Sequence, residues 1–320
     1  MNPTKPYGTL AHHLQKIEQR GMHLDVDLAT QWLLTVGYYR LSGYWYPYRE
    51  LVQGCRSDTF VAGTSFHDVV ALYEFDRKLR TFIHDGVERI EVMLRTQLNE
   101  VLGQIDPLAY LEPSHFRPTF DHARWLKTIE GRVERARKRN EAVRHHDLKY
   151  GGQLPIWVLS EVLDFADVSR LFEALPASEQ WKVSVGMGVH VDVDQLSKNQ
   201  AHKALKNHPL VRWFEQIAIV RNTSAHHARL WNRSFTPVGT AGLRTIAELS
   251  SLPVGQSERL YGALCLMGVL LESASPGTKW RNKIKDLVET SFAPINGRHE
   301  GEMGFPEGWR NNPLWSRRPL

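Results

Sequence analysis

The chain has 320 residues, of which 42% are hydrophobic, enough for a folded protein with a substantial core. Its formal net charge of +5 permits contact with nucleic acid without requiring it. Cys55 and Cys265 are too few for a disulfide framework or a thiolate zinc site, so we expect two buried free thiols in a reducing compartment. The amino terminus lacks the apolar core of a secretory signal, and no apolar run is long enough for a bilayer. These features predict a cytoplasmic protein without membrane contact.

The first sixty residues predict two short helices and an aromatic cluster. Apolar residues from Leu10 to Ile17 have helical spacing, and Asp27 is the expected cap of a second helix through Leu34. Residues 38–49 then contain six aromatic side chains and two arginines. Packing of the rings explains this cluster more simply than stacking on single-stranded bases, which is the alternative.

The clearest helical signal begins after Thr64 or Ser65, either of which is an expected cap, with Asp68 in near capping-box position. Apolar residues recur at helical spacing for most of ten turns, at Val69, Leu72, Leu79, Phe82, Ile83, Val87, Ile90, Leu94, Leu98 and Val101. Gly86 leaves open whether this segment is one helix or two, since an interior glycine costs about 1 kcal/mol relative to alanine.

A charged helix is expected from His122 to Lys149, after a loop marked by prolines. Residues 121–150 carry nine lysines or arginines against five acidic residues, so much of the excess positive charge is local. A solvated helix face is the common explanation of such a charge run, and contact with RNA phosphates is the alternative. The basic residues expected to make such contacts are Arg135, Arg137, Lys138 and Arg139.

The remainder of the chain is also expected to be mainly helical. Helices are predicted over residues 155–163, 166–175, 207–220, 257–273 and 278–290. Residues 186–194 alternate weakly, which fits either a short strand or an irregular loop. From residue 293 the abundance of proline, glycine, tryptophan and arginine indicates a tail laid along a surface. The fold class is therefore all-α and bundle-like.

Arg221 and His226 follow an apolar helix and supply the two groups needed to break an RNA phosphodiester without a metal. A histidine exchanges a proton near neutral pH, so His226 would deprotonate a ribose 2′-hydroxyl or protonate the departing 5′-oxygen. Arg221 would hold the phosphoryl oxygens and stabilise the growing charge, and Asn222 would orient the phosphate or the imidazole. The expected products are a 2′,3′-cyclic phosphate and a 5′-hydroxyl.

The geometry of this pair on a helix is not simple. Residues five apart are separated by about 140° around the axis, so Arg221 and His226 do not share a face, whereas Asn222 and His226 do. Arg221 would still reach His226 if the helix ends or distorts around Thr223 and Ser224, or if its long side chain sweeps sideways. The alternative is that two copies of the helix meet and share the site across a two-fold axis. The spacing itself is weakly specific, because Arg117 and His122 repeat it in a proline-containing loop.

Blocks of sequence in the chain resemble the Abi-like bacterial abortive-infection proteins of the AbiD and AbiF type. The similar blocks are residues 37–45, 72–80, 87–96, 155–161, 221–233 and 303–306 with Trp309 and Trp315. They come in family order and span nearly the whole chain. The resemblance implies membership of the HEPN superfamily, helical-bundle proteins many of which are metal-independent endoribonucleases that act as dimers.

The resemblance maps the Arg-x-x-x-x-His motif of that superfamily onto Arg221 and His226, with its polar residue at Asn222. It places the family's acidic helix at Glu88 and Glu91, which lie near Arg95 on one helix face. Three further polar residues follow His226 closely in the sequence. His227 is expected to support the site, and Arg229 and Arg233 are expected to contact RNA.

The resemblance also implies a place in anti-phage defence or in a toxin-antitoxin pair. RNA would be the substrate, the chain a homodimer, and a protein or RNA antitoxin a further partner, with no cofactor. The expected organisation is an HEPN-like core over 63–235 that contains the basic helical insertion 121–150. An aromatic-rich segment, 1–62, precedes this core, and C-terminal helices with a Pro/Trp-rich tail, 236–320, follow it.

Two other classes of function compete with the nuclease. A non-catalytic RNA-binding or regulatory module is supported by the basic segment, the aromatic cluster and the tail residues Arg310, Arg317 and Arg318. A metalloenzyme would use His145, His146, His226 and His227. Adjacent histidines on a helix point about 100° apart, and the spacings typical of zinc sites do not occur, so no metal is expected.

Overall fold

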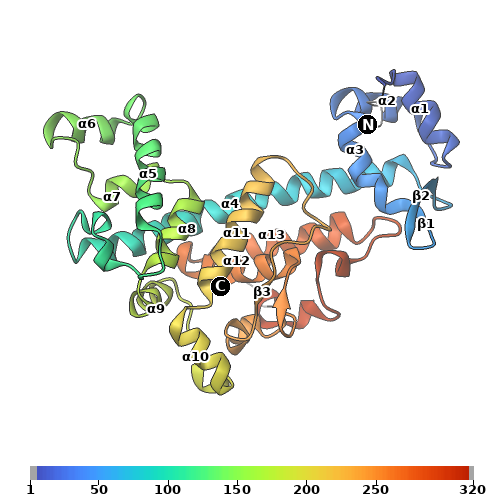
Figure 1. Ribbon diagram of the computed structural model, residues 1–320. Coiled ribbons are helices and arrows are strands. Elements are labelled where there is room, and N and C mark those ends of the chain that lie inside the picture. Colours follow the sequence, from blue (N-terminus) through green and yellow to red (C-terminus); the bar gives the residue numbers. More distant parts are fainter. Residues whose placement is uncertain (1–5, 317–320) are drawn as a thin grey trace.

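The computed structural model describes residues 6–316, which form an all-α protein as expected (Figure 1). Its α-helices are α1 (Leu10–Gln19), α2 (Val26–Thr35), α3 (Tyr38–Trp45), α4 (Phe66–Gly103), α5 (His122–Arg137), α6 (Glu141–Lys149), α7 (Ile156–Leu159), α8 (Phe165–Ala174), α9 (Ala177–Gly186), α10 (Lys198–Lys206), α11 (Leu210–Ala225), α12 (Leu260–Ala274), α13 (Trp280–Leu287) and α14 (Pro313–Ser316). Two small antiparallel sheets pair β1 (Arg49–Val52) with β2 (Cys55–Phe60), and β3 (Val238–Gly239) with β4 (Gln256–Ser257). Arg317 and Arg318 lie outside the described residues.

The long helix α4 carries the other elements. Helices α1 to α3 and the β1–β2 hairpin lie at its beginning, helices α5 to α7 lie at its other end, and α11 to α13 pack against its middle (Figure 1). Ser65 caps α4, because its hydroxyl accepts from the Asp68 N–H at 3.2 Å and donates to the Asp68 carboxylate at 2.6 Å. The apolar stripe then keeps one face buried over its whole length.

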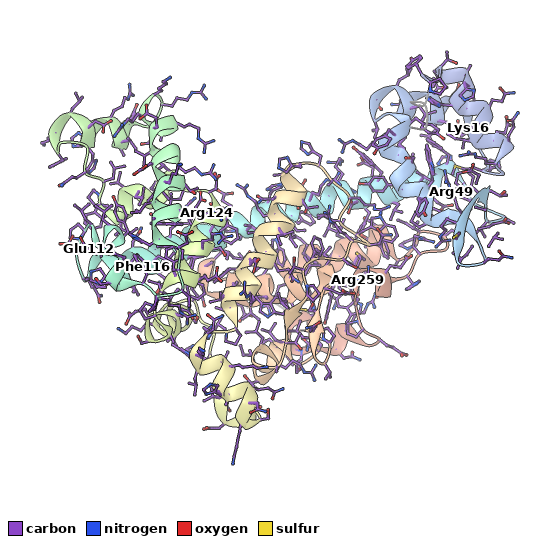
Figure 2. All side chains as sticks on the ribbon, in the orientation of Figure 1. Lys16, Arg49, Glu112, Phe116, Arg124 and Arg259 are labelled. Atoms are coloured by element: carbon purple, nitrogen blue, oxygen red, sulfur yellow. The ribbon has the colours of Figure 1, made fainter. Side chains whose placement is uncertain are left out.

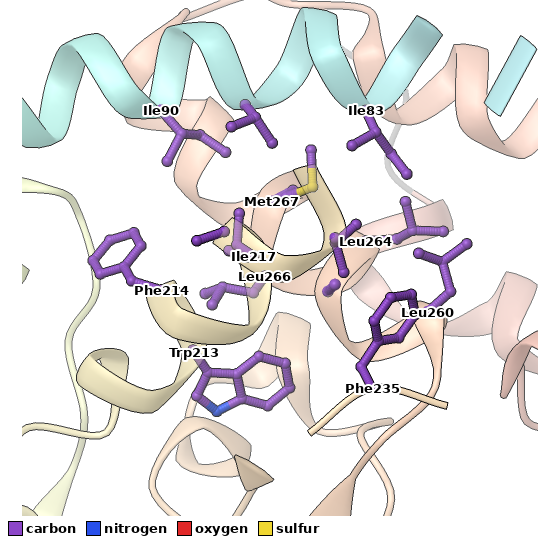
Figure 3. Packing of buried hydrophobic residues seen from close by; sticks show 14 of the residues in the cluster. Ile83, Ile90, Trp213, Phe214, Ile217, Phe235, Leu260, Leu264, Leu266 and Met267 are labelled. Carbon is purple, nitrogen blue, oxygen red and sulfur yellow. The ribbon is translucent and has the colours of Figure 1, made fainter. Parts of the chain in front are cut away.

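The centre of the core lies where α4, α11 and α12 meet (Figure 3). Ile83 and Ile90 of α4 face Ile217 of α11 and Met267 of α12. All four side chains are fully buried. Each such side chain contributes about 1.5–3 kcal/mol when it leaves water. This packing fixes the direction in which the carboxyl end of α11 leaves the core.

Gly86 does not break α4, and its environment explains why a glycine stands there. A Cβ at this position would lie 2.8 Å from Met267 Cε and 2.9 Å from Trp280 Nε1. Trp280 is itself held by a hydrogen bond of 2.6 Å from its Nε1 to the Phe82 carbonyl. The missing side chain therefore lets α12 and α13 pack directly against α4.

We expect Gly86→Ala to lower the free energy of unfolding by about 1 kcal/mol. Overpacking costs about 1–3 kcal/mol, which exceeds the gain of about 1 kcal/mol in helix propensity. Gly131 of α5 is the matched control, because a Cβ there meets nothing within 4 Å, and its alanine variant should gain about 0.5–1 kcal/mol. Chemical denaturation checks this, and equal stabilisation by the two substitutions would contradict the packing argument.

The boundaries of several elements differ from the sequence-based predictions. Asp25, not Asp27, caps α2, since its carboxylate accepts from the Leu28 N–H at 3.0 Å. The helix expected over residues 122–149 is two helices, because Asn140 caps α6 with its side chain. Residues 186–194 contain the end of α9 and a loop rather than a strand. The sequence patterns also missed α9 and α10.

The segment after residue 293 is part of the core and not only a surface tail. Trp309 and Trp315 are buried, and their rings meet edge to face with centroids 5.4 Å apart. Phe305 and Tyr261 of α12 complete the aromatic group. Among residues 6–316, no helix combines the length and the apolar character that a membrane span requires.

The two cysteines differ, which corrects the expectation that both are buried. Cys55 is exposed in the β1–β2 hairpin, whereas Cys265 is fully buried in α12, where burial raises the pKa of its thiol to about 12. We therefore expect one thiol per folded chain to react rapidly with an aromatic disulfide reagent, and two after denaturation. Rapid reaction of two thiols in the folded protein would contradict this burial.

Candidate functional site

The last turn of α11 carries the predicted motif. The helix stays regular through Ala225, and His226 follows as its C-cap, with its backbone N–H donating to the Asn222 carbonyl at 3.0 Å. The Arg221 guanidinium donates to the Asn222 amide oxygen at 3.1 Å. Asn222 and His226 are exposed, and Arg221 is half-buried. The helix neither ends nor distorts at Thr223 and Ser224, so the backbone positions of Arg221 and His226 are about 140° apart around the axis.

His227 ends the helix in a left-handed conformation, with φ of +55°. Its N–H donates to the Ser224 carbonyl, and the Ala228 N–H donates to the Thr223 carbonyl, each at 3.0 Å. These two bonds form a Schellman motif, in which glycine is the usual residue at this position. A histidine there costs backbone strain, and such strain is concentrated at functional sites.

A buried carboxylate on α4 holds the loop that follows His227. Asp76 is fully buried, and its oxygens accept from the Leu230 N–H at 3.2 Å and the Trp231 N–H at 3.0 Å. The same carboxylate accepts from the Tyr44 hydroxyl at 2.8 Å and from Arg80 at 2.7 Å. Burial raises the pKa of Asp76, and these four partners oppose that rise. The Asp76 cluster therefore ties α3, α4 and the loop together.

Two arginines complete the attachment of this loop. Arg40 of α3 donates to the His227 carbonyl at 2.6 Å, and Arg229 donates to the Gly43 carbonyl. Arg229 is half-buried, and burial lowers its pKa. Arg229 was expected to contact RNA, and the structure shows that its guanidinium also attaches this loop to α3. Arg40, Tyr44, Asp76 and Arg80 were not among the predicted site residues.

Glu91 lies opposite Arg221 where α4 and α11 cross. It is 8% exposed and pairs with Arg95 at 2.5 Å, and Arg95 also donates to the Leu163 carbonyl. Burial raises the pKa of Glu91, whereas the charges of Arg95 and Arg221 lower it. Glu91 thus lies within electrostatic reach of the motif arginine. Glu88, the other residue of the expected acidic pair, is exposed one turn away.

The remaining predicted RNA contacts lie apart from the motif. Arg135, Lys138 and Arg139 are exposed around the end of α5, and no ion pair engages them within the described part of the chain. Arg137 differs, because it pairs with Glu134 at 2.9 Å and contacts a second carboxylate. Arg233 is exposed beyond the loop that Asp76 holds.

Basic residues occur at each end of α4. Figure 2 shows Lys16 and Arg49 at one end of the molecule and Arg124 of α5 toward the other. In the view of Figure 1, the carboxyl end of α11 lies between these two groups of helices. The motif therefore lies between the helices at the two ends of α4.

The four histidines of the metalloenzyme hypothesis are not gathered. His145 and His146 belong to α6, where their rings pack with Tyr150, whereas His226 and His227 end α11. Over residues 6–316, no three or more His, Cys, Asp or Glu side chains are grouped so that they would hold a metal ion.

The fold and the site define a class: an all-α protein with an arginine, an asparagine and two histidines at the end of one core helix. A family model described as Abi-like protein matches residues 31–232, and the chain belongs to this family. The matched region includes the Asp76 cluster as well as Arg221 and His226. No curated protein and no solved structure gives a significant match.

Proposed function

We propose that the chain is a metal-independent endoribonuclease of an abortive-infection or toxin-antitoxin system. The observation that carries this proposal is the group formed by the half-buried Arg221 and the exposed Asn222 and His226 at the end of α11, followed by a loop that the Asp76 cluster holds. Membership of the Abi-like family supports the role in defence. Rigid placement favours catalysis, since misplacing a reacting group by about 1 Å costs about 100-fold in rate.

In the proposed reaction, His226 removes the proton from a ribose 2′-hydroxyl. The 2′-oxygen forms a bond to phosphorus, and the bond from phosphorus to the 5′-oxygen breaks. A second imidazole gives its proton to that 5′-oxygen, which leaves as a hydroxyl. Arg221 binds the phosphoryl oxygens, and Asn222 fixes the Arg221 guanidinium through the contact at 3.1 Å. The products are a 2′,3′-cyclic phosphate and a 5′-hydroxyl.

The site proposed here contains two copies of the chain. Because α11 is regular through Ala225, Arg221 and His226 of one chain are separated by about 140° around the axis. A two-fold pairing of the exposed helix ends would set the arginine of one copy beside the histidine of the other. It would also bring the second imidazole that the reaction uses.

The proposal is tested by incubating the purified protein with total RNA in the presence of EDTA. We expect fragments to accumulate, and a substrate with a single 2′-deoxy position should resist cleavage at that position. Salt-sensitive RNA binding without any fragments would instead favour the non-catalytic RNA-binding module, with Arg135, Lys138 and Arg139 as its contacts.

His227→Gly is expected to separate stability from activity. Glycine adopts the left-handed conformation without strain, so the free energy of unfolding should rise by about 0.5–1 kcal/mol. Cleavage should fall about tenfold, because the exposed imidazole beside His226 is lost. His227→Asn is the control, since asparagine tolerates this conformation. Unchanged cleavage by the glycine variant would remove His227 from the site.

A further inference from the structure

A cavity of about 740 Å³ lies at the beginning of α11, the end opposite to Arg221. Its walls come from α8, α10, the first turn of α11 and the loops that contain Phe120 and Gly242. The volume is that of a small-molecule site. Helix α11 has 16 residues and is about 24 Å long, so the cavity is separate from the proposed RNA site.

The lining of this cavity is positively charged. Five arginines or lysines line it against only two carboxylates, Asp121 and Glu173. Arg170, Lys203 and Lys206 are exposed, and none of these three side chains takes part in an ion pair within the described region. Three cations without carboxylate partners at one cavity raise the local concentration of anions.

A fourth cation, Arg117, forms part of the wall, and among the described residues no carboxylate forms a direct ion pair with it. Its guanidinium donates to the Leu175 carbonyl at 2.8 Å, the Asn207 amide oxygen at 2.8 Å and the Lys206 carbonyl at 2.5 Å. It also donates to the Gln180 amide oxygen at 3.2 Å. All four acceptors are neutral, so these bonds hold the wall in place but do not cancel the charge. Burial lowers the pKa of Arg117, and the charge of Glu173 only partly opposes this.

The cavity also has a flat apolar side. The Phe120 ring is half-buried at the cavity and packs against Phe116 and Trp125, with centroid distances of 5.8 and 6.1 Å. Gly242 closes the wall near Pro209, where a Cβ would lie 2.6 Å from the proline Cγ. A fixed aromatic ring beside unpaired cations suits a ligand that carries a planar ring and a phosphate.

We infer that this cavity binds a phosphorylated small molecule of about mononucleotide size. The phosphate contacts Arg170 and Lys203, and the ring of the ligand lies against Phe120. Walls from five separate segments favour a small molecule over a polynucleotide. The inference does not depend on the proposed nuclease activity, because it concerns the other end of α11.

The test is isothermal titration calorimetry of the full chain with AMP, ribose 5-phosphate, inorganic phosphate and adenosine. We expect saturable AMP binding, with adenosine at least about tenfold weaker because it lacks the phosphate. The double variant R170E/K203E should lose at least about tenfold in AMP affinity. Lys198→Glu is the matched control, since Lys198 is exposed on α10 but does not line the cavity. The AMP affinity of Lys198→Glu should stay within about twofold of the wild-type affinity.

Ribose 5-phosphate and inorganic phosphate show which parts of the ligand the cavity contacts. Ribose 5-phosphate weaker than AMP supports contact of the base with Phe120, whereas inorganic phosphate as tight as AMP would overturn the ring contact. Absence of saturable AMP binding at millimolar concentration would overturn the inference. An equal loss of AMP affinity in Lys198→Glu and in R170E/K203E would also overturn it. The same holds if an RNA oligonucleotide binds through Arg170 and Lys203 and AMP does not bind. Thermal melting of each variant confirms that it is folded.

Discussion

Replacement of Asp76 by alanine is expected to lower the free energy of unfolding by about 3–5 kcal/mol. The change leaves the buried Arg80 without its carboxylate and leaves the backbone N–H groups of Leu230 and Trp231 without acceptors. Each of these losses is costly because the groups are buried. Chemical denaturation of the variant measures the effect.

Asp85→Ala is the matched control for this prediction. Asp85 lies on the same helix and also pairs with an arginine four residues on, Arg89, at 2.6 Å, but the pair is partly exposed. Its loss should cost about 0–1 kcal/mol. Similar losses in the two variants would contradict a special role for Asp76. The rate of RNA cleavage should also fall in Asp76→Asn, even below the melting temperature of this variant, because the loop after His226 is no longer held.

Arg221→Ala and His226→Ala are each expected to lower RNA cleavage by about 100-fold to 10,000-fold. The imidazole moves the proton of the 2′-hydroxyl, and the guanidinium stabilises the charge on the phosphoryl group. The folded state should be little affected, because His226 is exposed, Arg221 donates its hydrogen bond only to its neighbour Asn222, and Glu91 keeps its direct partner Arg95. Initial rates of cleavage of a labelled RNA measure the effect.

Two further variants sharpen this comparison. Arg221→Lys keeps the charge but loses the two-pronged contact with phosphate, so its rate should lie between those of wild type and Arg221→Ala. His202→Ala removes an exposed histidine from α10 and should leave cleavage unchanged. A large loss in His202→Ala, or none in His226→Ala, would contradict the assignment.

Local patterns were sufficient to predict the long elements. The apolar stripe of α4, its cap at Thr64 or Ser65 and the start of α11 after Pro209 are properties of short stretches. The structure confirms them, with Ser65 as the cap. The break at Asn140 was missed because a cap within a charged helix resembles any other polar position. Helices α9 and α10 were missed because their own apolar patterns are short.

The contacts that hold the motif are between residues far apart in the chain. Asp76 and Leu230 are 154 positions apart, and no local spacing shows that they meet. A signal was nevertheless present, because Asp76 lies on the apolar stripe between Phe75 and Leu79, where a charged residue is out of place. Glu91 has the same position between Ile90 and Leu94. Carboxylates on a buried helix face therefore marked one residue that holds the loop after the motif and one that interacts with Arg221.

The chemistry of the RNA ends made by the chain tests its central claim most directly. Wild-type protein and His226→Ala would be incubated with one RNA in EDTA, and the fragment ends identified by mass spectrometry. We expect 2′,3′-cyclic phosphate and 5′-hydroxyl ends from the wild type and almost no fragments from the variant. Fragments with 3′-hydroxyl and 5′-phosphate ends, or equal cleavage by His226→Ala, would contradict it.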